Sequence, residues 1–322
     1  FAVHTRRTQG DARRKTLEAQ LQELLQELGE PKFRAKQLFD WLHAKQVDSF
    51  AEMTNLSKSL REKLGETAAI NGVKIVRRLV SQIDGTRKYL FALSDGAIIE
   101  SVLMKYEHGN TVCISTQVGC RMGCKFCMTG RQGFHGNLTV ADILSQFIAI
   151  DEAAELTNAV FMGMGEPLDN FGNVMRAIEV LTSDWGFGWS PKRVTLSTIG
   201  VLPNLRKYLE STRCHLAVSL HNPFPDERAE MMPVQKAWPV QEVIEMIREY
   251  DFTGQRRVSF EYTMFAGLND DKRHADALIR LLRGLECRVN LIRFHKIPDA
   301  PFETTPQIIM ERFRDRLSNH GI

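Results

Sequence analysis

Apolar residues recur at helical spacing in the first part of the chain. Five leucines between positions 17 and 28 follow the spacing of one face of an amphipathic helix: Leu17, Leu21, Leu24, Leu25 and Leu28. Gly29 and Pro31 predict the end of this helix. A second helix is predicted from Phe33 to Ala44, and a third begins after Ser57 as N-cap and ends near Gly65. We therefore interpret residues 1–66 as a small helical domain.

The pattern then changes to alternation of apolar and polar residues, which indicates β-strands. Three strands are predicted: Val73 to Val80, Lys88 to Leu93 and Ala97 to Met104. Asp84-Gly85 and Asp95-Gly96 lie between them and are typical of tight hairpin turns. Residues 67–110 are thus predicted to form a short β-meander that links the helical domain to the rest of the chain.

From position 111 onward, a short apolar strand followed by a helix-length segment occurs six times. The predicted strands are Thr111 to Thr116, Ala159 to Met162, Arg193 to Thr198, His215 to Leu220, Arg257 to Met264 and Arg288 to Phe294. Six such units predict an α/β fold with a parallel sheet, because each crossover helix returns the chain to the same edge. A partial barrel and a doubly wound sheet both fit this pattern, and in either one ligands bind at the carboxyl ends of the strands.

Unusual polar segments follow these strands directly. QVGC follows the first strand and GMGEP (163–167) follows the second. Ser197 ends the third strand, Ser219-Leu220-His221 ends the fourth, and His295 follows the sixth. All of them are therefore expected at one rim of the sheet.

Composition limits the class of protein. The chain has 322 residues, 43% of them hydrophobic, which is enough for a large core. Its formal net charge of +3 permits a polyanionic partner without indicating one. No apolar run approaches the roughly 20 residues of a membrane span, and none follows the basic start FAVHTRRTQGDARRK as in a secretory signal. We expect a cytoplasmic protein.

Three of the six cysteines are clustered. Cys120, Cys124 and Cys127 lie within eight residues, and clustered thiols in a reducing compartment indicate metal or redox chemistry. An iron–sulfur cluster is usually held by four cysteines, so a four-iron cluster held by three keeps one iron open for a ligand. Structural zinc would need a fourth ligand, for which His135 is the nearby candidate.

The spacing CxxxCxxC, with Phe126 before its last cysteine, resembles the signature of radical S-adenosylmethionine (SAM) enzymes. CISTQVGCRMGCKFCMTGRQGF, VFMGMGEPLDN, RVTLSTIGV, LAVSLHNP and CRVNLI together resemble the RlmN/Cfr family of adenosine methyltransferases. GEPKFRAKQLFDWLH and EMTNLSKSLR extend the resemblance upstream, toward the RlmN branch. The resemblance implies that residues 111–322 form a partial (βα)6 barrel, and that a 4Fe-4S cluster on the three cysteines chelates SAM through its open iron.

The resemblance also implies the reaction. One SAM methylates a protein cysteine, and a second is cleaved reductively to a 5′-deoxyadenosyl radical that takes a hydrogen from the cysteine methyl group. The methylene radical adds to carbon 2 of adenine, a position that is not nucleophilic, and another cysteine resolves the adduct by forming a disulfide. Cys113 matches the resolving cysteine and Glu100 matches the proton acceptor. From composition alone, Cys113 would be a buried strand thiol and Glu100 a solvated hairpin residue.

Further positions match cofactor contacts of the family. Gly165 and Glu166 resemble the GEP motif, in which glycine lets the backbone approach the cofactor and the carboxylate holds its ammonium group. Ser197, Ser219, Leu220 and His221 match contacts to the ribose and carboxylate, although each also fits ordinary hydrogen bonding at a strand end. His295 stands where the best-known relatives have Asn.

The implied partners are 23S ribosomal RNA, transfer RNA and an electron donor such as flavodoxin or ferredoxin. We expect the protein itself to be a monomer. Two basic groups are candidate RNA contacts, one around the cysteine loop and one near the N-terminus: Arg121, Lys125 and Arg131; Arg6, Arg7, Arg13, Arg14 and Lys15. The helical domain would also contact RNA, and the target base is expected to leave its stack to reach the rim.

The methyl-carrying cysteine of the family lies in a segment resembling RGxDIxAACG, which we expect beyond Ile322. Neither Cys214 nor Cys287 has that context, and both are predicted to be core thiols. Three functions therefore fit the sequence: a carbon-2 adenosine methyltransferase, a carbon-8 methyltransferase of the Cfr type, and an inactive RNA-binding protein that retains the cluster or zinc.

Overall fold

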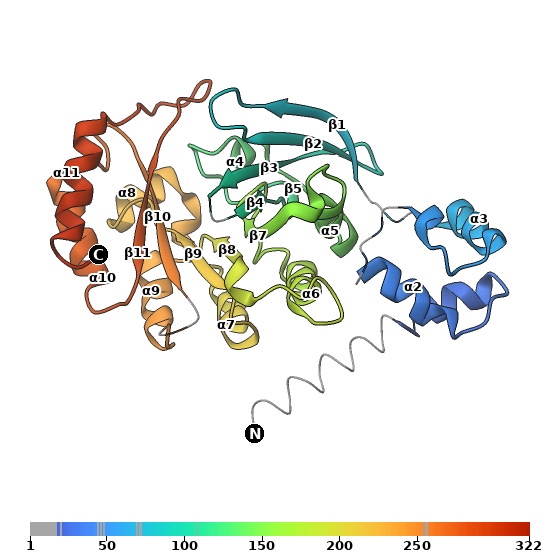
Figure 1. The fold of residues 1–322 in the computed structure, drawn as a ribbon. Helices are drawn as coiled ribbons and strands as arrows, with labels where there is room; N and C mark the ends of the chain where they lie inside the picture. The colour runs from blue at the N-terminus through green and yellow to red at the C-terminus, as the bar shows by residue number, and fades with distance from the viewer. Residues whose placement is uncertain are drawn as a thin grey trace.

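A nine-stranded sheet organises the molecule (Figure 1). The computed structural model describes residues 18–19, 21–43, 45, 47, 49–68, 70, 73–107, 109–252, 254 and 257–322. The strand order is β1-β2-β3-β4-β7-β8-β9-β10-β11, and β5 and β6 form a separate two-stranded sheet. No helix of the described residues is both long and apolar enough to cross a membrane.

The N-terminal helical unit has its own small core. Residues 21–27 are helical and are followed by α2 (Arg34–His43), η1 (Phe50–Glu52) and α3 (Lys58–Thr67). Ser57 is the N-cap of α3, as predicted, because its side chain accepts a hydrogen bond from the Leu60 backbone N–H. Leucines and Met53 fill the space between these helices, while Phe39 of α2 contacts Trp185 of the main domain with ring centroids 5.6 Å apart.

The β-meander continues the main sheet. β1 (Val73–Val80), β2 (Arg87–Leu93) and β3 (Ile98–Tyr106) pair antiparallel, with the predicted turns between them. β3 then pairs antiparallel with β4 (Gly109–Cys113), the first strand of the parallel part. Residues 67–110, predicted as a linker, therefore form the edge of the sheet that carries the candidate site.

The parallel part confirms the six predicted strands and decides between the two architectures. β4, β7 (Leu156–Phe161), β8 (Val194–Thr198), β9 (His215–Ser219), β10 (Val258–Met264) and β11 (Arg288–Arg293) pair in the order of the sequence. A doubly wound sheet needs a reversal of strand order, which is absent from these described strands. The arrangement is that of a partial (βα)6 barrel, and β1 and β11 do not pair with each other.

One element pair escaped the sequence analysis. β5 (Gln117–Gly119) and β6 (Phe134–Asn137) are too short to show a periodic pattern, and they pair antiparallel on either side of α4 (Met128–Gln132). Gly119 allows this pairing, because its φ is +72° and a Cβ there would lie 1.8 Å from the Gly133 carbonyl oxygen.

Helices cover one face of the sheet and leave the other for the site. The connections after β4 contain α5 (Val140–Ile148), η2 (Ala153–Glu155), α6 (Phe171–Thr182), η3 (Pro191–Arg193), α7 (Leu202–Ser211), α8 (Pro225–Met231), η4 (Pro233–Lys236), α9 (Val240–Arg248), α10 (Lys272–Leu282) and α11 (Gln307–Ser318). Alternate strand residues such as Val112, Leu196 and Leu216 join their apolar faces in one core. The residues between them, among them Cys113 and Ser197, share the opposite, inner face.

A buried glutamine ties α5 to the sheet. The Gln146 side chain is fully buried, and its Oε1 accepts hydrogen bonds from the Ser101 hydroxyl (2.7 Å) and the Ser115 backbone N–H (2.8 Å). Its Nε2 donates to the Ser115 carbonyl at 2.9 Å. These contacts join β3 and the chain after β4 to α5, and so they fix the strand end from which the cysteine loop begins.

We expect Gln146→Leu to destabilise the fold by about 2 to 4 kcal/mol, because the buried polar groups of Ser101 and Ser115 lose their partners. Equilibrium urea unfolding measures this change. Gln26→Leu, at an exposed position of the N-terminal helix, is the matched control and should change the free energy of unfolding by less than about 0.5 kcal/mol. Equal effects of the two substitutions would contradict a special role of the buried amide.

Candidate functional site

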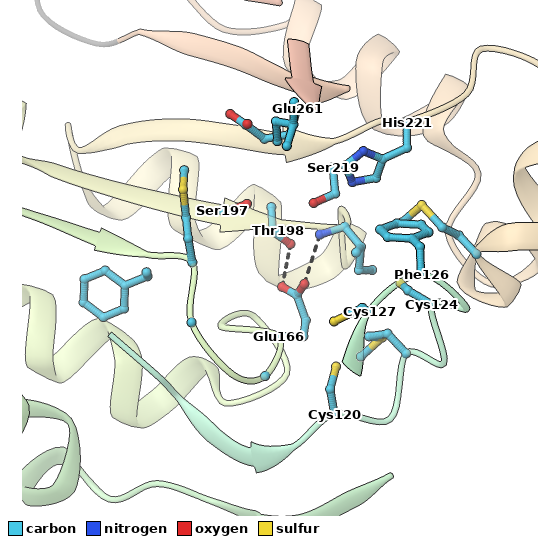
Figure 2. Close-up of a pocket in the computed structure, with 18 residues that line it drawn as sticks. Cys120, Cys124, Phe126, Cys127, Glu166, Ser197, Thr198, Ser219, His221 and Glu261 are labelled. Carbon is cyan, nitrogen blue, oxygen red and sulfur yellow. Dashed lines mark hydrogen bonds between the residues drawn. The ribbon is translucent and has the colours of Figure 1, made fainter. Parts of the chain in front are cut away.

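A cavity of about 240 Å³ lies at the carboxyl ends of the parallel strands. The segment 120–127, here called the cysteine loop, forms one wall with Cys120, Cys124 and Cys127 (Figure 2). Residues after β7 and at the ends of β8, β9 and β10 form the remaining walls, among them Gly165, Glu166, Ser197, Ser219 and His221. The structure thus brings together eight of the twelve residues that the sequence predicted for the site.

Main-chain hydrogen bonds hold the cysteine loop in place. The Cys120 N–H donates to the Gly133 carbonyl at 2.9 Å, and the Lys125 N–H donates to the Met231 carbonyl of α8 at 3.0 Å. The Cys127 N–H donates to the Cys124 carbonyl at 3.1 Å, and Cys127 is the N-cap of α4. These main-chain bonds tie the loop to both ends of α4 and to α8.

The three thiols face the cavity in a largely apolar setting. Burial raises the pKa of Cys120 to about 11 and that of Cys124 to about 12, and the other cysteines of the loop add to both shifts. In the part of the chain that the structure describes, no three His, Cys, Asp or Glu side chains lie close enough together to hold a single metal ion. All six cysteines are free thiols.

Glu166 is the most enclosed acid of the cavity. Its Oε1 accepts from the Thr198 hydroxyl (2.6 Å) and the Leu168 N–H (3.0 Å), and its Oε2 accepts from the Ile199 N–H (2.9 Å). Burial raises the pKa of this carboxyl to about 7 in spite of these three bonds, which lower it. In Figure 2 the carboxylate lies between the cysteine loop and the end of β8. Oε2 retains a lone pair for a donor in the cavity.

The backbone beside Glu166 requires glycine. Gly165 has a φ of +101°, and a Cβ at this position would lie 2.5 Å from the Cβ of Gln117. The Gln117 side chain in turn accepts a hydrogen bond from the Glu166 N–H at 2.9 Å. Replacement of this glycine would therefore push apart two segments that both border the cavity.

His221 is buried, neutral and held in a strained backbone conformation. Its φ is +57°, which is uncommon for a residue other than glycine. Burial lowers the pKa of the imidazole to about 3, and the Arg228 guanidinium contributes to the same shift. Nδ1 accepts a hydrogen bond from the Thr263 N–H at 3.0 Å, so the proton of the neutral ring is on Nε2.

Two predicted cofactor contacts lie outside the cavity wall. The Leu220 side chain is fully buried in the core, its N–H donates to the Glu261 carbonyl, and its carbonyl accepts from Arg228. His295 is exposed and does not line the cavity. The roles of these two residues stay predictions.

Cys113 and Glu100 share the inner face of the sheet next to the cavity. Cys113 is paired with Val102 of β3 and Val160 of β7, and Glu100 is two residues from Val102. Residues two apart on a strand point to the same face, so both side chains lie on the inner face. Burial raises the Cys113 pKa to about 11, while Glu100 forms an ion pair with Lys88 at 2.7 Å.

The sequence analysis missed Thr198 and Glu261 as cavity residues. Glu261 lies in the middle of β10 between Ser219 of β9 and Asn290 of β11, whose Nδ2 donates to its carboxylate at 2.9 Å. Burial raises the pKa of Glu261. A charged residue inside the otherwise apolar run VSFEYTM was the signal that could have found it.

Comparisons with known proteins agree with this architecture. Residues 16–70 match the family model "Ribosomal RNA large subunit methyltransferase N-terminal domain", and residues 114–278 match "Radical SAM superfamily". A crystal structure of a radical SAM methyltransferase from Sphaerobacter thermophilus superposes with a TM-score of 0.89 at 39% identity, covering 95% of this chain and 92% of that one.

Curated relatives extend over nearly the whole chain. A protein of Porphyromonas gingivalis named probable dual-specificity RNA methyltransferase RlmN is 54% identical over 91% of this chain and 86% of its own length. The protein of the same name from Bacteroides thetaiotaomicron is 48% identical over 94% and 88%. The dual-specificity RNA methyltransferase RlmN of Syntrophus aciditrophicus is 42% identical over 94% and 87%. This chain belongs to the RlmN family of radical SAM RNA methyltransferases.

Proposed function

We propose that this protein methylates carbon 2 of an adenosine in 23S ribosomal RNA and in transfer RNA, acting in the cytoplasm. The observation that carries the proposal is the meeting of three thiols and a buried carboxylate in one cavity at the carboxyl ends of six parallel strands. The relatives named for dual specificity favour the carbon-2 branch over the carbon-8 branch.

The cysteine loop fits a 4Fe-4S cluster better than a zinc ion. Zinc with sulfur ligands at about 2.3 Å requires its thiolates to converge on one point. The three thiols of the loop line a common cavity without such convergence, and His135 is not among the cavity residues. Cys120, Cys124 and Cys127 would therefore hold the larger, multi-iron cluster, after losing the protons that burial favours.

The remaining walls fit SAM. Glu166 would accept a hydrogen bond from its ammonium group, and Ser197 and Ser219 would contact its hydroxyl or carboxylate oxygens. The Nε2–H of His221 is a further donor at the same wall. When bound, the cluster and SAM supply a carbon-centred radical once an electron arrives from a donor such as flavodoxin or ferredoxin.

The inner face next to the cavity would handle the base and its proton. Cys113 would resolve the covalent adduct by forming a disulfide with the methyl-carrying cysteine. Glu100 would accept the proton released from carbon 2, and the ion pair with Lys88 at 2.7 Å orients its carboxylate. Because these groups lie on the inner face of the sheet beside the cavity, the adenine would have to leave its stack to reach them.

Two of the three basic residues of the cysteine-loop group already have partners within the protein. Arg121 forms an ion pair with Asp169 at 2.9 Å and stacks on Phe134, and Arg131 donates to the Pro298 carbonyl. Lys125 is exposed beside the cavity and is the residue of this group that we propose for phosphate contact. The basic N-terminal group, Arg6 to Lys15, lies outside the described residues.

Anaerobic reconstitution tests the proposal. We expect the protein from its complete gene to take up about four irons per chain, to form 5′-deoxyadenosine from SAM after reduction, and to yield 2-methyladenosine in digested RNA by mass spectrometry. Cys124→Ser should abolish all three results, while Cys214→Ser, at a buried core thiol, should keep them. Only zinc in the protein, or no 5′-deoxyadenosine, would favour an inactive RNA-binding protein, and 8-methyladenosine would favour the Cfr reaction.

The raised pKa of Glu166 predicts opposite pH trends for SAM binding and for stability. The carboxylate needed for the ammonium forms as pH rises through about 7, so SAM affinity, measured by calorimetry, should rise over this range. The pKa of Glu166 is higher in the folded than in the unfolded protein. Protonated Glu166 therefore increases the free energy of unfolding at low pH, and this contribution is lost as pH rises toward 7.

Glu166→Gln should weaken SAM binding and flatten its pH profile. Glu261→Gln, at the other buried acid of the cavity, should leave the shape of the profile unchanged. If Glu261→Gln flattens the profile and Glu166→Gln does not, then Glu166 is not the partner of the ammonium group.

Gly165→Ala should lower the free energy of unfolding by about 2 kcal/mol or more, because the added methyl group meets Gln117 and the positive φ disfavours alanine. SAM affinity should fall with it, since the displaced backbone borders the cavity. Gly172→Ala in α6 is the matched control: no atom lies within 4 Å of the position that its added methyl group would take, so urea unfolding should show equal or greater stability. An unchanged SAM affinity in Gly165→Ala would show that the backbone there does not approach the ligand.

A further inference from the structure

An arginine is completely buried behind the cysteine loop. Arg228 of α8 has no exposed surface. Its Nε donates to the Leu220 carbonyl and its Nη2 to the Ser219 carbonyl, both at 2.8 Å. Its Nη1 donates to Oε1 of Gln235 at 2.5 Å. The guanidinium is thus hydrogen-bonded, but every acceptor is neutral.

No carboxylate compensates this charge among the described ion pairs. The adjacent acid, Glu227, is turned to Arg273 and His274 at 2.7 Å from each. The guanidinium instead lies directly behind the cavity wall, because Ser219, whose carbonyl accepts from Nη2, lines the same cavity as Cys124. Thiolates that hold a cluster in this cavity would therefore be the anions next to the guanidinium.

The contacts of α8 explain this proximity. The Met231 carbonyl, three residues after Arg228, accepts the hydrogen bond from the Lys125 N–H in the cysteine loop. Met231 and Met232 pack with Cys124 in one apolar cluster. The end of α8 thus rests directly on the loop, and the apolar packing keeps water away from the space between them.

A buried guanidinium without an anion is costly, since hydrogen bonds to carbonyls satisfy its donors but do not balance its charge. An iron–sulfur cluster on three thiolates carries a net negative charge, and this charge grows by one when the cluster accepts an electron. In a medium of low dielectric constant, a fixed positive charge nearby stabilises the reduced cluster more than the oxidised one.

We propose that Arg228 is the buried counter-charge of the iron–sulfur cluster and that it raises the reduction potential of the cluster. The proposal rests on the function proposed above. The electron comes from a low-potential one-electron donor, and Arg228 binds neither this donor nor SAM. It acts through the cluster, while its contacts to the carbonyls of Ser219 and Leu220 also hold the end of β9.

The test is the midpoint potential of the reconstituted cluster, measured by an anaerobic redox titration followed by electron paramagnetic resonance. Arg228→Gln should lower the equilibrium constant for reduction about tenfold or more, a shift of about 59 mV to more negative potential for one electron. Arg228→Lys keeps the charge and should stay close to the unsubstituted protein.

A second variant keeps the proposal open to refutation if Arg228→Gln does not fold. Gln235→Glu has nearly the same shape and still accepts from Arg228 and from the Val240 N–H, and it loses only the bond that Nε2 donates to Gln241 at 3.2 Å. Its carboxylate neutralises the guanidinium. It should therefore shift the potential in the same negative direction. Arg248→Gln is the matched control, because Arg248 also donates to two carbonyls, at 2.9 and 2.8 Å, but lies outside the cavity wall. The cluster of the Arg248→Gln variant should keep the midpoint potential of the unsubstituted protein.

Each outcome has one meaning. Failure of the unsubstituted protein to bind iron and sulfide would overturn the proposed function. A cluster whose potential is the same in Gln235→Glu or Arg228→Gln as in the unsubstituted protein would overturn only the role of Arg228. A weaker affinity for SAM at unchanged potential would show that Arg228 merely positions Ser219 and Leu220, and it would also overturn the counter-charge.

Discussion

Main-chain hydrogen bonds between the cysteine loop and its neighbours are the constraint on which the site depends. The Cys120 N–H and the Lys125 N–H donate to carbonyls of the chain before β6 and of α8, respectively. These bonds run through the main chain and leave the thiol groups available as ligands. The thiols can therefore be presented to the cavity before a metal is bound, and their replacement should alter ligand binding more than it alters the loop.

Burial of charge is the second feature that the site elements share. Glu166, His221 and Arg228 are all buried, and desolvation favours the neutral form of each. It raises the pKa of Glu166 and lowers the pKa values of His221 and Arg228. Such an arrangement costs stability unless ligands bring the opposite charges. An ammonium group beside Glu166 and a negative cluster beside Arg228 would do this, so binding of the two cofactors and stabilisation of the cavity would be one process.

The sequence predicted the strands well because the repeated βα pattern and the turn residues are local signals. The six parallel strands and the Ser57 cap were confirmed, and the order of strands in the sheet then excluded the doubly wound alternative. Positions on the rim were predictable for the same reason, since the carboxyl ends of parallel strands meet at one edge. Local patterns could not show that the meander continues the main sheet, because this depends on the pairing of β3 with β4. They also could not show that Arg228 is buried. An arginine in the acidic helix PDERAEM would be expected to face solvent, and its burial depends on the packing of α8 against the cysteine loop.

The pairing of β3 with β4 gives the meander a direct part in the site. Cys113 is the last residue of β4 and has neighbours in both halves of the sheet, Val102 on the antiparallel side and Val160 on the parallel side. The antiparallel register places Glu100 on the same face as Cys113, and Lys88 of β2 fixes its carboxylate. A shift of one residue in this register would turn Glu100 to the helical face and separate it from the thiol. The position of the predicted proton acceptor relative to the predicted resolving cysteine is therefore set by residues 73–113, and the barrel strands alone would not supply it.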